Sequence, residues 1–225
     1  MNYREFFRRF GGSARTKNIG TQSWWPFRTH RDDNKPFVRL PETSGLPKEF
    51  IRLCPWEIEF LFAVARRAEV GILEIGRFNG GSTFMLACAN SKVPIFSIDI
   101  APQNDTLLGQ MFERHNAGKN VSLIVGDSRA RHDRIGAVDV IFFDGDHSYS
   151  GCSADIETWY DSVVPGGLLV FHDSYLNEDY GVQDAILDLI AEKGESVEVV
   201  VSPLIGASYW RYPQGSMACV RKKRR

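Results

Sequence analysis

The sequence predicts an α/β fold in which helices pack on both faces of a doubly wound, mostly parallel sheet. Three observations predict it. Short runs rich in Val, Ile and Phe alternate with helical segments from residue 55 onward, as in repeated strand–helix–strand units. Glycine and acidic turns follow several of these runs. The chain has 225 residues, 43% of them hydrophobic, which is enough for one sizeable core.

The first fifty residues are expected to be an irregular N-terminal extension. The turn-forming stretches GGS, WWP, NKP and LPETSGLP interrupt any periodic pattern there, apart from one short basic helix expected at Tyr3–Phe10. We expect this extension, residues 1–50, either to cover the active site as a flap or to contact another subunit, so that a homo-oligomer stays open as an alternative.

The globular domain, expected at residues 51–220, opens with a helix at Trp56–Ala68. Pro55 suits the first turn of a helix, and the apolar residues behind it form one broad face. The alternation continues as strand Val70–Ile75, helix Gly81–Asn90, strand Val93–Ile98, helix Thr106–Asn116, strand Val121–Val125 and strand Val138–Phe143.

The second half repeats this order and then changes it. After Val138–Phe143 come helix Gly151–Ser162, strand Gly167–Phe171 and helix Gly181–Lys193. Because parallel strands need crossover connections, these units predict a parallel sheet with right-handed crossovers. Val197–Val201 and Ser216–Val220 are expected to pair antiparallel at one edge. The result is a seven-stranded, Rossmann-like sheet with an antiparallel edge strand.

Charge is segregated along the chain although its net value is −1. Residues 1–40 carry nine Lys/Arg and three Asp/Glu (+6), residues 221–225 carry +5, and the remainder is therefore −1 − 6 − 5 = −12. The acidic middle argues against a nucleic-acid partner, and the basic tail, residues 221–225, is expected to be a solvated end. No apolar run approaches the ~20 residues of a membrane span, and no secretory signal is visible, which favours a cytoplasmic location.

The four cysteines indicate neither disulfides nor a thiolate metal site. Cys54, Cys88, Cys152 and Cys219 are widely separated and form no CxxC pair. They are expected to be small buried hydrophobic residues.

Oxygen and imidazole side chains follow two predicted strands. Asp144, Asp146 and His147 come after the strand Val138–Phe143, and His172 and Asp173 come after Gly167–Phe171. Ligands of open parallel sheets bind outside the carboxyl ends of the strands, so these side chains should converge. Adjacent residues of a regular strand face opposite ways, so His172 and Asp173 can both face the site only where the strand ends. Such a group could hold a divalent cation beside a substrate hydroxyl.

A glycine-rich turn follows the first strand. The stretch LEIGRFNGGS, residues 73–82, has the spacing G-x-x-x-G-G and lacks both the dinucleotide and the triphosphate fingerprints. An adenosyl ligand without phosphates therefore fits better. Asp99, at the end of the second strand, is placed to hydrogen-bond ribose hydroxyls. Gly126, Asp127 and Ser128, after the third strand, could meet the edge of the adenine.

Over residues 55–220 the sequence resembles the class I S-adenosylmethionine-dependent methyltransferases. Within them it is similar to the metal-dependent O-methyltransferases of the macrocin and sugar-modifying type and, more distantly, to the catechol type. The resemblance rests on LEIGRFNGGST, FSIDI and VGDS for the donor half, and on FFDGDHSY with PGGLLVFHD for the catalytic half.

The resemblance implies a methyl donor, S-adenosyl-L-methionine, and a divalent metal. It implies that Asp144, His172 and Asp173 hold the metal, with Mg²⁺ expected first. Because Mg²⁺ prefers oxygen ligands and many relatives have a carboxylate or amide at the place of His172, this histidine either shifts the preference toward Mn²⁺ or orients the substrate instead. Asp146 becomes the general base and His147 its orienting partner, with substrate binding or the base itself as alternatives for His147. The donor site would comprise Glu74, Gly76, Arg77, Phe78, Gly80, Ser82, Asp99, Ile100, Gly126, Asp127, Ser128 and Asp144.

The expected function is methyl transfer to a hydroxyl of a small molecule, a sugar or glycosylated natural product. The metal would lower the pKa of the hydroxyl and Asp146 would take its proton. One alternative is a relative similar to cephalosporin hydroxylase, with the same fold and changed chemistry. Another alternative is a nucleic-acid methyltransferase. Such enzymes that methylate base amines carry a motif like Asn-Pro-Pro-Tyr after the fourth strand, and this sequence has DGDH there, which argues against that alternative.

Overall fold

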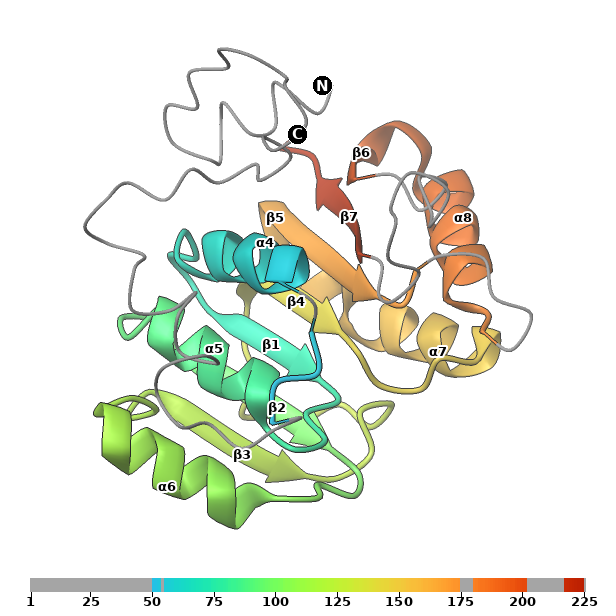
Figure 1. Ribbon diagram of the computed structural model, residues 1–225. Coiled ribbons are helices and arrows are strands. Elements are labelled where there is room, and N and C mark those ends of the chain that lie inside the picture. Colours follow the sequence, from blue (N-terminus) through green and yellow to red (C-terminus); the bar gives the residue numbers. More distant parts are fainter. Residues whose placement is uncertain (1–49, 54, 175–179, 202–216, 225) are drawn as a thin grey trace, which may run out of the picture.

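The computed structural model describes residues 50–53, 55–174, 180–201 and 217–224 (Figure 1). Nearly all of the expected N-terminal extension, including the helix expected at Tyr3–Phe10, lies outside the described residues. Within them the strands form one seven-stranded sheet of order β3-β2-β1-β4-β5-β7-β6. Their bounds are β1 Ile72–Ile75, β2 Ile95–Asp99, β3 Val121–Val125, β4 Val138–Phe143, β5 Val163–His172, β6 Val197–Val201 and β7 Met217–Lys222.

The predicted fold class is confirmed. Strands β3, β2, β1, β4 and β5 pair in parallel, and β7 pairs antiparallel with both β5 and β6. The antiparallel strand β7 therefore lies one position inside the edge, and β6 forms the edge itself. The order reverses between β1 and β4, and a doubly wound sheet opens a crevice for ligands at such a switch point.

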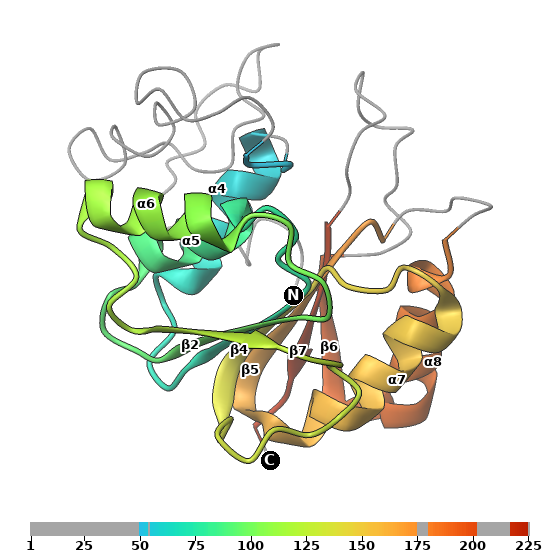
Figure 2. The ribbon, with the colours of Figure 1, turned by 90° about the horizontal axis from the view of Figure 1, so that it is seen from below.

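Helices cover both faces of the sheet (Figure 2). Helices α4 (Pro55–Ala65), α5 (Gly81–Ala89) and α6 (Asp105–His115) lie on one face, and α7 (Tyr149–Trp159) and α8 (Val182–Lys193) lie on the other. Two short 3₁₀ turns, Tyr160–Ser162 and Gly194–Ser196, follow α7 and α8. No helix in the described ranges combines the length and the apolar character that a bilayer crossing needs.

Two hydrophobic clusters, one on each face, hold the layers together. Leu61 and Leu86 pack with Phe142 and Val170 on the face of α4 and α5. Trp159, from α7, packs with residues such as Leu73 and Phe171 on the other face. All of these side chains are almost fully buried, and each contributes about 1.5–3 kcal/mol of hydrophobic free energy. Burial on both faces explains why β4 reads as a nearly continuous apolar run.

Strand β5 begins at Val163, four residues before the predicted start at Gly167. The stretch VPGG looks like a turn, but the pairing of β4 with β5 shifts register between Val138 and Val140, which accommodates it as an irregularity within the sheet. Helix α7 begins at Tyr149, two residues earlier than predicted, because the Ser148 hydroxyl caps it by accepting a hydrogen bond from the Gly151 N–H.

The basic tail begins later than expected. Strand β7 extends through Lys222, and Arg221 is only 6% exposed. Its guanidinium donates to the Glu198 carboxylate at 2.8 Å across the β6–β7 pair. Arg221 therefore belongs to the sheet and is not part of a solvated end, because a partner acid on the neighbouring strand neutralises its charge.

The thiols of Cys152 and Cys219 are free and buried, and that of Cys88 is partly buried. Burial raises the pKa of each to about 12, so these thiols stay protonated and unreactive. This agrees with their expected role as small hydrophobic residues. Cys54 lies outside the described residues.

Candidate active site

One cavity of about 1080 Å³ opens at the carboxyl ends of the parallel strands. The loops after β1, β2, β3, β4 and β5 line it, together with Phe50–Leu53 and Glu57 of α4. The predicted crevice at the switch point therefore exists. Most of the site residues predicted from sequence border it.

The glycine-rich loop after β1 allows the backbone of β4 to approach closely. Gly76 has φ 84°, and a Cβ there would lie 2.1 Å from the carbonyl oxygen of Asp144. Gly80, with φ 83°, precedes the first turn of α5. Both positions require glycine, because a side chain would be strained and, at Gly76, would collide with main chain. At these two glycines the loop thus has peptide groups and no side chain.

Asp99 ends β2 with its carboxylate fixed by main-chain donors. The N–H groups of Arg77 and Phe78 donate to Oδ2, both at 2.8 Å, and the N–H of Ala101 donates to Oδ1 at 2.7 Å. Each carboxylate oxygen has about two acceptor sites, so capacity for further donors remains on Oδ1. Asp99 lines the cavity, as the ribose prediction requires.

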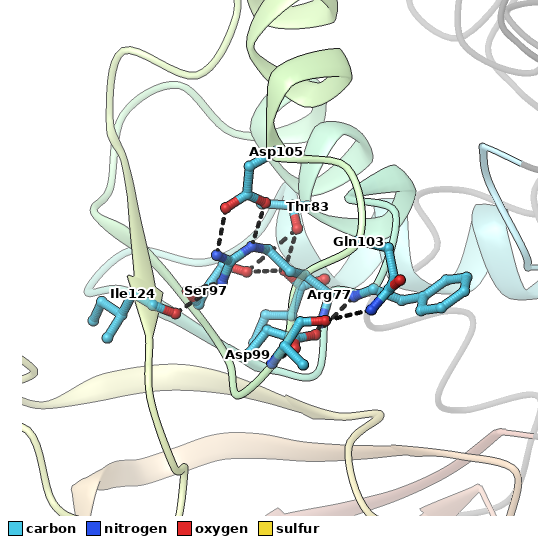
Figure 3. A network of polar contacts seen from close by, with 10 residues as sticks. Arg77, Thr83, Ser97, Asp99, Gln103, Asp105 and Ile124 are labelled. Carbon is cyan, nitrogen blue, oxygen red and sulfur yellow. Dashed lines mark hydrogen bonds and ion pairs between the residues drawn. The ribbon is translucent and has the colours of Figure 1, made fainter.

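The Arg77 side chain is held within a network of polar contacts (Figure 3). Its guanidinium forms a two-pronged ion pair with Asp105, at 2.7 and 2.9 Å, and donates to the carbonyl oxygens of Ser97 and Ile124. This side chain is fully buried and ties the β1 loop to β2, β3 and α6. Arg77 still borders the cavity, where its main-chain N–H holds Asp99.

Glu74, predicted in the donor site, lies beneath the cavity and not on its wall. Its side chain is fully buried on the α5 face of β1, where Thr83 Oγ1 and Ser97 Oγ donate to Oε2 at 2.5 and 2.6 Å. Burial raises the pKa of Glu74 to about 7, against the opposing effect of these hydroxyl donors. The strand alternation explains its place, because neighbouring Leu73 and Ile75 pack on the opposite face.

Two predicted donor-site residues present apolar surface at the rim. Phe78 is 45% exposed and Ile100 is 67% exposed. The guanidinium carbon of Arg52 lies 5.2 Å from the centre of the Phe78 ring. These side chains give the β1–β2 side of the cavity a partly apolar wall.

Asp144, His147, His172 and Asp173 form a group, called here the four-residue cluster, in which one ligand atom from each residue lies within 4.8 Å of the others. His172 Nδ1 lies 2.9 Å from Asp144 Oδ1 and 3.2 Å from Asp173 Oδ2. Strand β5 ends at His172, and Asp173 has φ 48°. This left-handed turn lets two adjacent side chains face the same site, as the predicted metal set requires.

His147 faces this cluster and not Asp146, contrary to its expected orienting role. Its Nε2 lies 3.5 Å from Asp144 Oδ1 and 3.7 Å from Asp173 Oδ2, and its ring packs 4.8 Å from that of Tyr180. Asp146 borders the cavity outside the cluster, where Oδ1 accepts from the Ser148 N–H at 2.9 Å. The turn after β4 thus points Asp144 and His147 inward together and turns Asp146 toward the start of α7.

Glu57 joins the cluster from α4, and the sequence reading missed it. It is 1% exposed, and its Oε2 lies 3.3 Å from His172 Nε2. An acid in the first turn of a helix is ordinarily explained by the helix dipole, so no local signal identifies this one. It is the long-range packing of α4 that brings its carboxylate to the end of β5.

The cluster concentrates negative charge around two imidazoles. Burial alone would lower the pKa of His172, but the charge of Asp144 and the hydrogen bonds to Asp144, Asp173 and Glu57 raise it well above its usual value. A hydrogen bond to Asp144 raises the pKa of His147. The imidazoles in turn outweigh burial and lower the pKa of Asp144. The cluster is therefore a site that favours positive charge.

The residues of the cluster fit a divalent cation. Ligands on opposite sides of an ion at about 2.1 Å are roughly 4.2 Å apart, which the 4.8 Å span of the cluster permits. Two carboxylates and two imidazoles make a mixed oxygen and nitrogen donor set. Mg²⁺ prefers oxygen ligands, whereas Mn²⁺, Fe²⁺ and Zn²⁺ also accept imidazole.

The loop after β3 is attached to α7. Ser128 Oγ donates to Asp155 Oδ1 at 2.7 Å, and Trp159 Nε1 donates to the Ser128 carbonyl oxygen at 2.7 Å. Asp127 instead forms an exposed ion pair with Arg129, which lowers the pKa of Asp127 to about 2. Asp155, 3% exposed and absent from the sequence predictions, also borders the cavity.

Residues 73–174, from β1 to the end of β5, match the family model described as a methyltransferase domain. Those strands and their loops supply the cavity described above. This stretch is therefore similar to methyltransferase domains. This match supports the resemblance to methyltransferases that the sequence analysis found.

Solved structures share the fold of this chain. An O-methyltransferase from Bacillus cereus in complex with SAH aligns with a TM-score of 0.58 and 20% identity, covering 83% of this chain and 88% of that one. An SAH-bound methyltransferase from Podospora anserina gives 0.55 and 19%, covering 76% and 80%. An rRNA methylase from Streptococcus thermophilus gives 0.58 and 16%, covering 77% and 99%. At such identities the likeness concerns the fold alone.

A curated relative, an uncharacterized protein of Acanthamoeba polyphaga mimivirus, is 30% identical over 129 residues. The match covers 52% of this chain and 57% of the relative. The chain therefore spans little more than half the length of the curated relative that it matches.

Proposed function

We propose that this protein transfers a methyl group from S-adenosylmethionine to a hydroxyl group of a small molecule, with a sugar or glycosylated natural product as the acceptor class. One observation carries the proposal. A nucleoside-type site, formed by Asp99 and the glycine loop, and a cation-type site, formed by the four-residue cluster, open into the same cavity. Methyl transfer to a hydroxyl needs both a donor and an activated oxygen within reach of each other.

The loops after β1, β2 and β3 would bind the donor. Asp99 would accept hydrogen bonds from ribose hydroxyls, and three main-chain N–H groups already hold its carboxylate in place. Such a fixed acceptor loses little conformational entropy on binding. The backbone of Gly76–Ser82 would lie against the amino-acid end of the donor, where glycines leave room for a close approach.

Asp144, His172 and Asp173 would hold a divalent cation, which when bound lowers the pKa of the acceptor hydroxyl. The imidazole of His172 favours an ion such as Mn²⁺ over Mg²⁺, the ion that the sequence favoured. Glu57 would orient His172 through its contact with Nε2, which leaves Nδ1 directed at the two acids.

His147 would take the proton of the acceptor, in place of Asp146. Its Nε2 lies among the cluster acids, and its ring is held by Tyr180 at the cavity wall. Asp146 is engaged by the Ser148 N–H just before α7, so its geometry supports a structural role in the turn that leads into the helix. A general base has to reach the proton that it removes, and this favours His147.

Calorimetric titration with SAH tests the donor half of the proposal. The full-length protein should bind SAH, and Mn²⁺ should bind after treatment with a chelator. Methyl transfer is then assayed with labelled S-adenosylmethionine on 4-nitrophenyl glycosides and on catechol, with and without Mn²⁺. Absence of SAH binding would falsify the proposal, whereas transfer that is indifferent to chelation would remove the metal from it.

One observation favours a second candidate, the hydroxylase-like relative. Two imidazoles and a carboxylate around one point are the ligand set of non-haem iron oxygenases. Such a protein would consume dioxygen when loaded with Fe²⁺ and would leave S-adenosylmethionine unchanged. An oxygen-electrode measurement beside the methyl-transfer assay separates the two candidates.

A further inference from the structure

Helix α7 carries a carboxylate on its buried face. The face consists of Cys152, Asp155, Ile156 and Trp159, of which only Asp155 is ionisable in the ordinary pH range, since burial keeps the Cys152 thiol protonated. Asp155 is 3% exposed, and no Lys, Arg or His in the described part of the chain forms an ion pair with it. A buried carboxylate is costly unless donors satisfy its oxygens. Its position therefore calls for a partner.

The protein itself supplies a donor to one of the two oxygens. Ser128 Oγ donates to Oδ1 at 2.7 Å. The other oxygen, Oδ2, lies beside Gly145, where a Cβ built on that glycine would be 3.6 Å away. Gly145 and Asp155 both line the cavity, so Oδ2 faces the space in which a ligand would bind.

The part of the cavity next to Asp155 matches the nucleobase end of an adenosyl ligand. Asp99 ends β2, and the Gly126 N–H donates to its carbonyl oxygen, so the loop after β3 adjoins the ribose position. That loop carries Ser128, the partner of Asp155. Ile100, 67% exposed at the rim, offers an apolar surface for a flat ring. A nucleoside held at Asp99 would extend its base toward this end.

We infer that Asp155 reads the nucleobase of the methyl donor, with Oδ2 accepting a hydrogen bond from the 6-amino group of adenine. The inference rests on the proposed methyl donor, S-adenosylmethionine, and adds Asp155 as the residue that selects adenine over other bases. A carboxylate accepts but does not donate, so it favours a 6-amino group and disfavours a 6-oxo group at the same place. The aromatic 6-amino group would supply a donor to Oδ2.

A purely structural role explains the residue less well. Anchoring Ser128 needs one acceptor oxygen, which an uncharged amide would provide without a buried charge. Trp159 Nε1 also holds the same loop through the Ser128 carbonyl oxygen. Burial raises the pKa of Asp155 to about 6, so the folded protein disfavours its charge. Ionisable groups kept in an unfavourable place beside a cavity are commonly functional.

The decisive experiment compares SAH with S-inosylhomocysteine, the analogue with oxygen in place of the 6-amino group. Calorimetry of the full-length wild-type protein should show SAH binding at least about tenfold tighter, as expected for losing one buried hydrogen bond and leaving the acceptor unpaired. In Asp155→Asn the amide can donate to the 6-oxo group, so the preference should fall below about threefold or invert. The anchor for Ser128 is retained, because the amide oxygen still accepts.

Two further variants make the test specific. Asp161→Asn removes the exposed acid of the 3₁₀ turn that follows α7, and it should keep the wild-type preference. Asp127→Asn removes the other acid of this end, which is paired with Arg129. If Asp127→Asn abolishes the preference and Asp155→Asn does not, Asp127 is the reader and the inference is wrong.

The remaining outcomes separate the inference from the proposed function. Equal binding of both ligands by the wild type overturns the role of Asp155 but leaves the methyl donor in place, and this result requires no variant to fold. A wild-type preference that persists unchanged in a folded Asp155→Asn protein does the same. Binding of neither ligand overturns the proposed function, and the inference with it.

Discussion

The two halves of the cavity hold their acids in different ways. The donor half is formed by the loops after β1, β2 and β3. There the main-chain N–H groups of Arg77, Phe78 and Ala101 hold the carboxylate of Asp99. In the cluster half, at the ends of β4 and β5, side chains from α4, β4 and β5 hold one another, and imidazoles neutralise acids. Peptide N–H groups do not titrate in the ordinary pH range, whereas the charges of the cluster residues change with pH and with any bound cation.

This difference indicates which half has its binding geometry before a ligand arrives. The donor half owes its geometry to backbone hydrogen bonds and to glycines that permit close approach, so it should bind its ligand whether or not the cluster is occupied. The cluster half has to balance several negative charges, so its arrangement should respond to a cation. Changes in one half should therefore leave the other largely intact, and the following predictions test that independence in order of expected effect.

The largest effect is expected from Asp173→Asn in the cluster half. Loss of one negatively charged ligand should lower Mn²⁺ affinity by about 10²-fold or more and methyl transfer by about 10³-fold, since both hydroxyl activation and positioning depend on the cation. The SAH dissociation constant should change less than about threefold. Calorimetry with Mn²⁺ and SAH in turn measures both quantities. A matching loss of SAH affinity would show that the halves are coupled.

The next effect distinguishes His147 from Asp146. His147→Gln should lower kcat by about 10²-fold, the usual contribution of a general base, with little change in SAH affinity. Asp146→Asn should retain most activity, because asparagine supports the same turn and its Oδ1 still accepts from the Ser148 N–H. Steady-state kinetics of the two variants side by side decide the assignment. The reverse order of effects would restore Asp146 as the base.

A smaller effect is expected from Asp99→Asn in the donor half. The main-chain donors of Arg77, Phe78 and Ala101 occupy both oxygens, so an amide nitrogen at either position would face an N–H group. SAH affinity should fall about tenfold to a hundredfold through the lost ribose acceptor and the disturbed loop. Mn²⁺ affinity should stay within about threefold. Unaltered SAH binding would remove the ribose role of Asp99.

Local patterns explain why so much of the fold could be predicted from the sequence. Strand β4, Val138–Phe143, and strand β3, Val121–Val125, agree with the predicted bounds at both ends, since their apolar runs are bounded by polar turns. The convergence of Asp144, His172 and Asp173 follows from a rule about strand ends and needs no detail of packing. β5 was predicted too short because Pro165 and Gly166 resemble a turn, although the sheet accommodates them.

The missed residues share one physical cause. Glu57 and Asp155 are acids on helices, where acids are usually solvated, and only tertiary packing decides that these two face inward. The direction of His147 depends on how the chain turns after β4, which a run of Asp, Gly and His does not specify. The direction of the Arg77 side chain has the same origin, because its ion-pair partner Asp105 lies on α6. Side chains whose direction is set at long range are thus the part that a single sequence leaves open.

The smallest effect concerns stability and sharpens the account of the donor half. Glu74 has a pKa of about 7 in the folded protein, raised by burial from an ordinary value near 4.5. The folded state therefore binds this proton more tightly than the unfolded state, so the contribution of Glu74 to stability is greatest at low pH and declines as pH rises from about 4.5 to 7. Glu74→Gln removes the buried charge and retains an acceptor for Thr83 and Ser97. At pH 8 the variant should be more stable by up to about 3 kcal/mol, with the difference vanishing near pH 4. Urea unfolding at both pH values measures it. A variant that is less stable at pH 8 would indicate that ionised Glu74 is held by a favourable contact, and that this acid belongs to the floor of the donor site as a charged group.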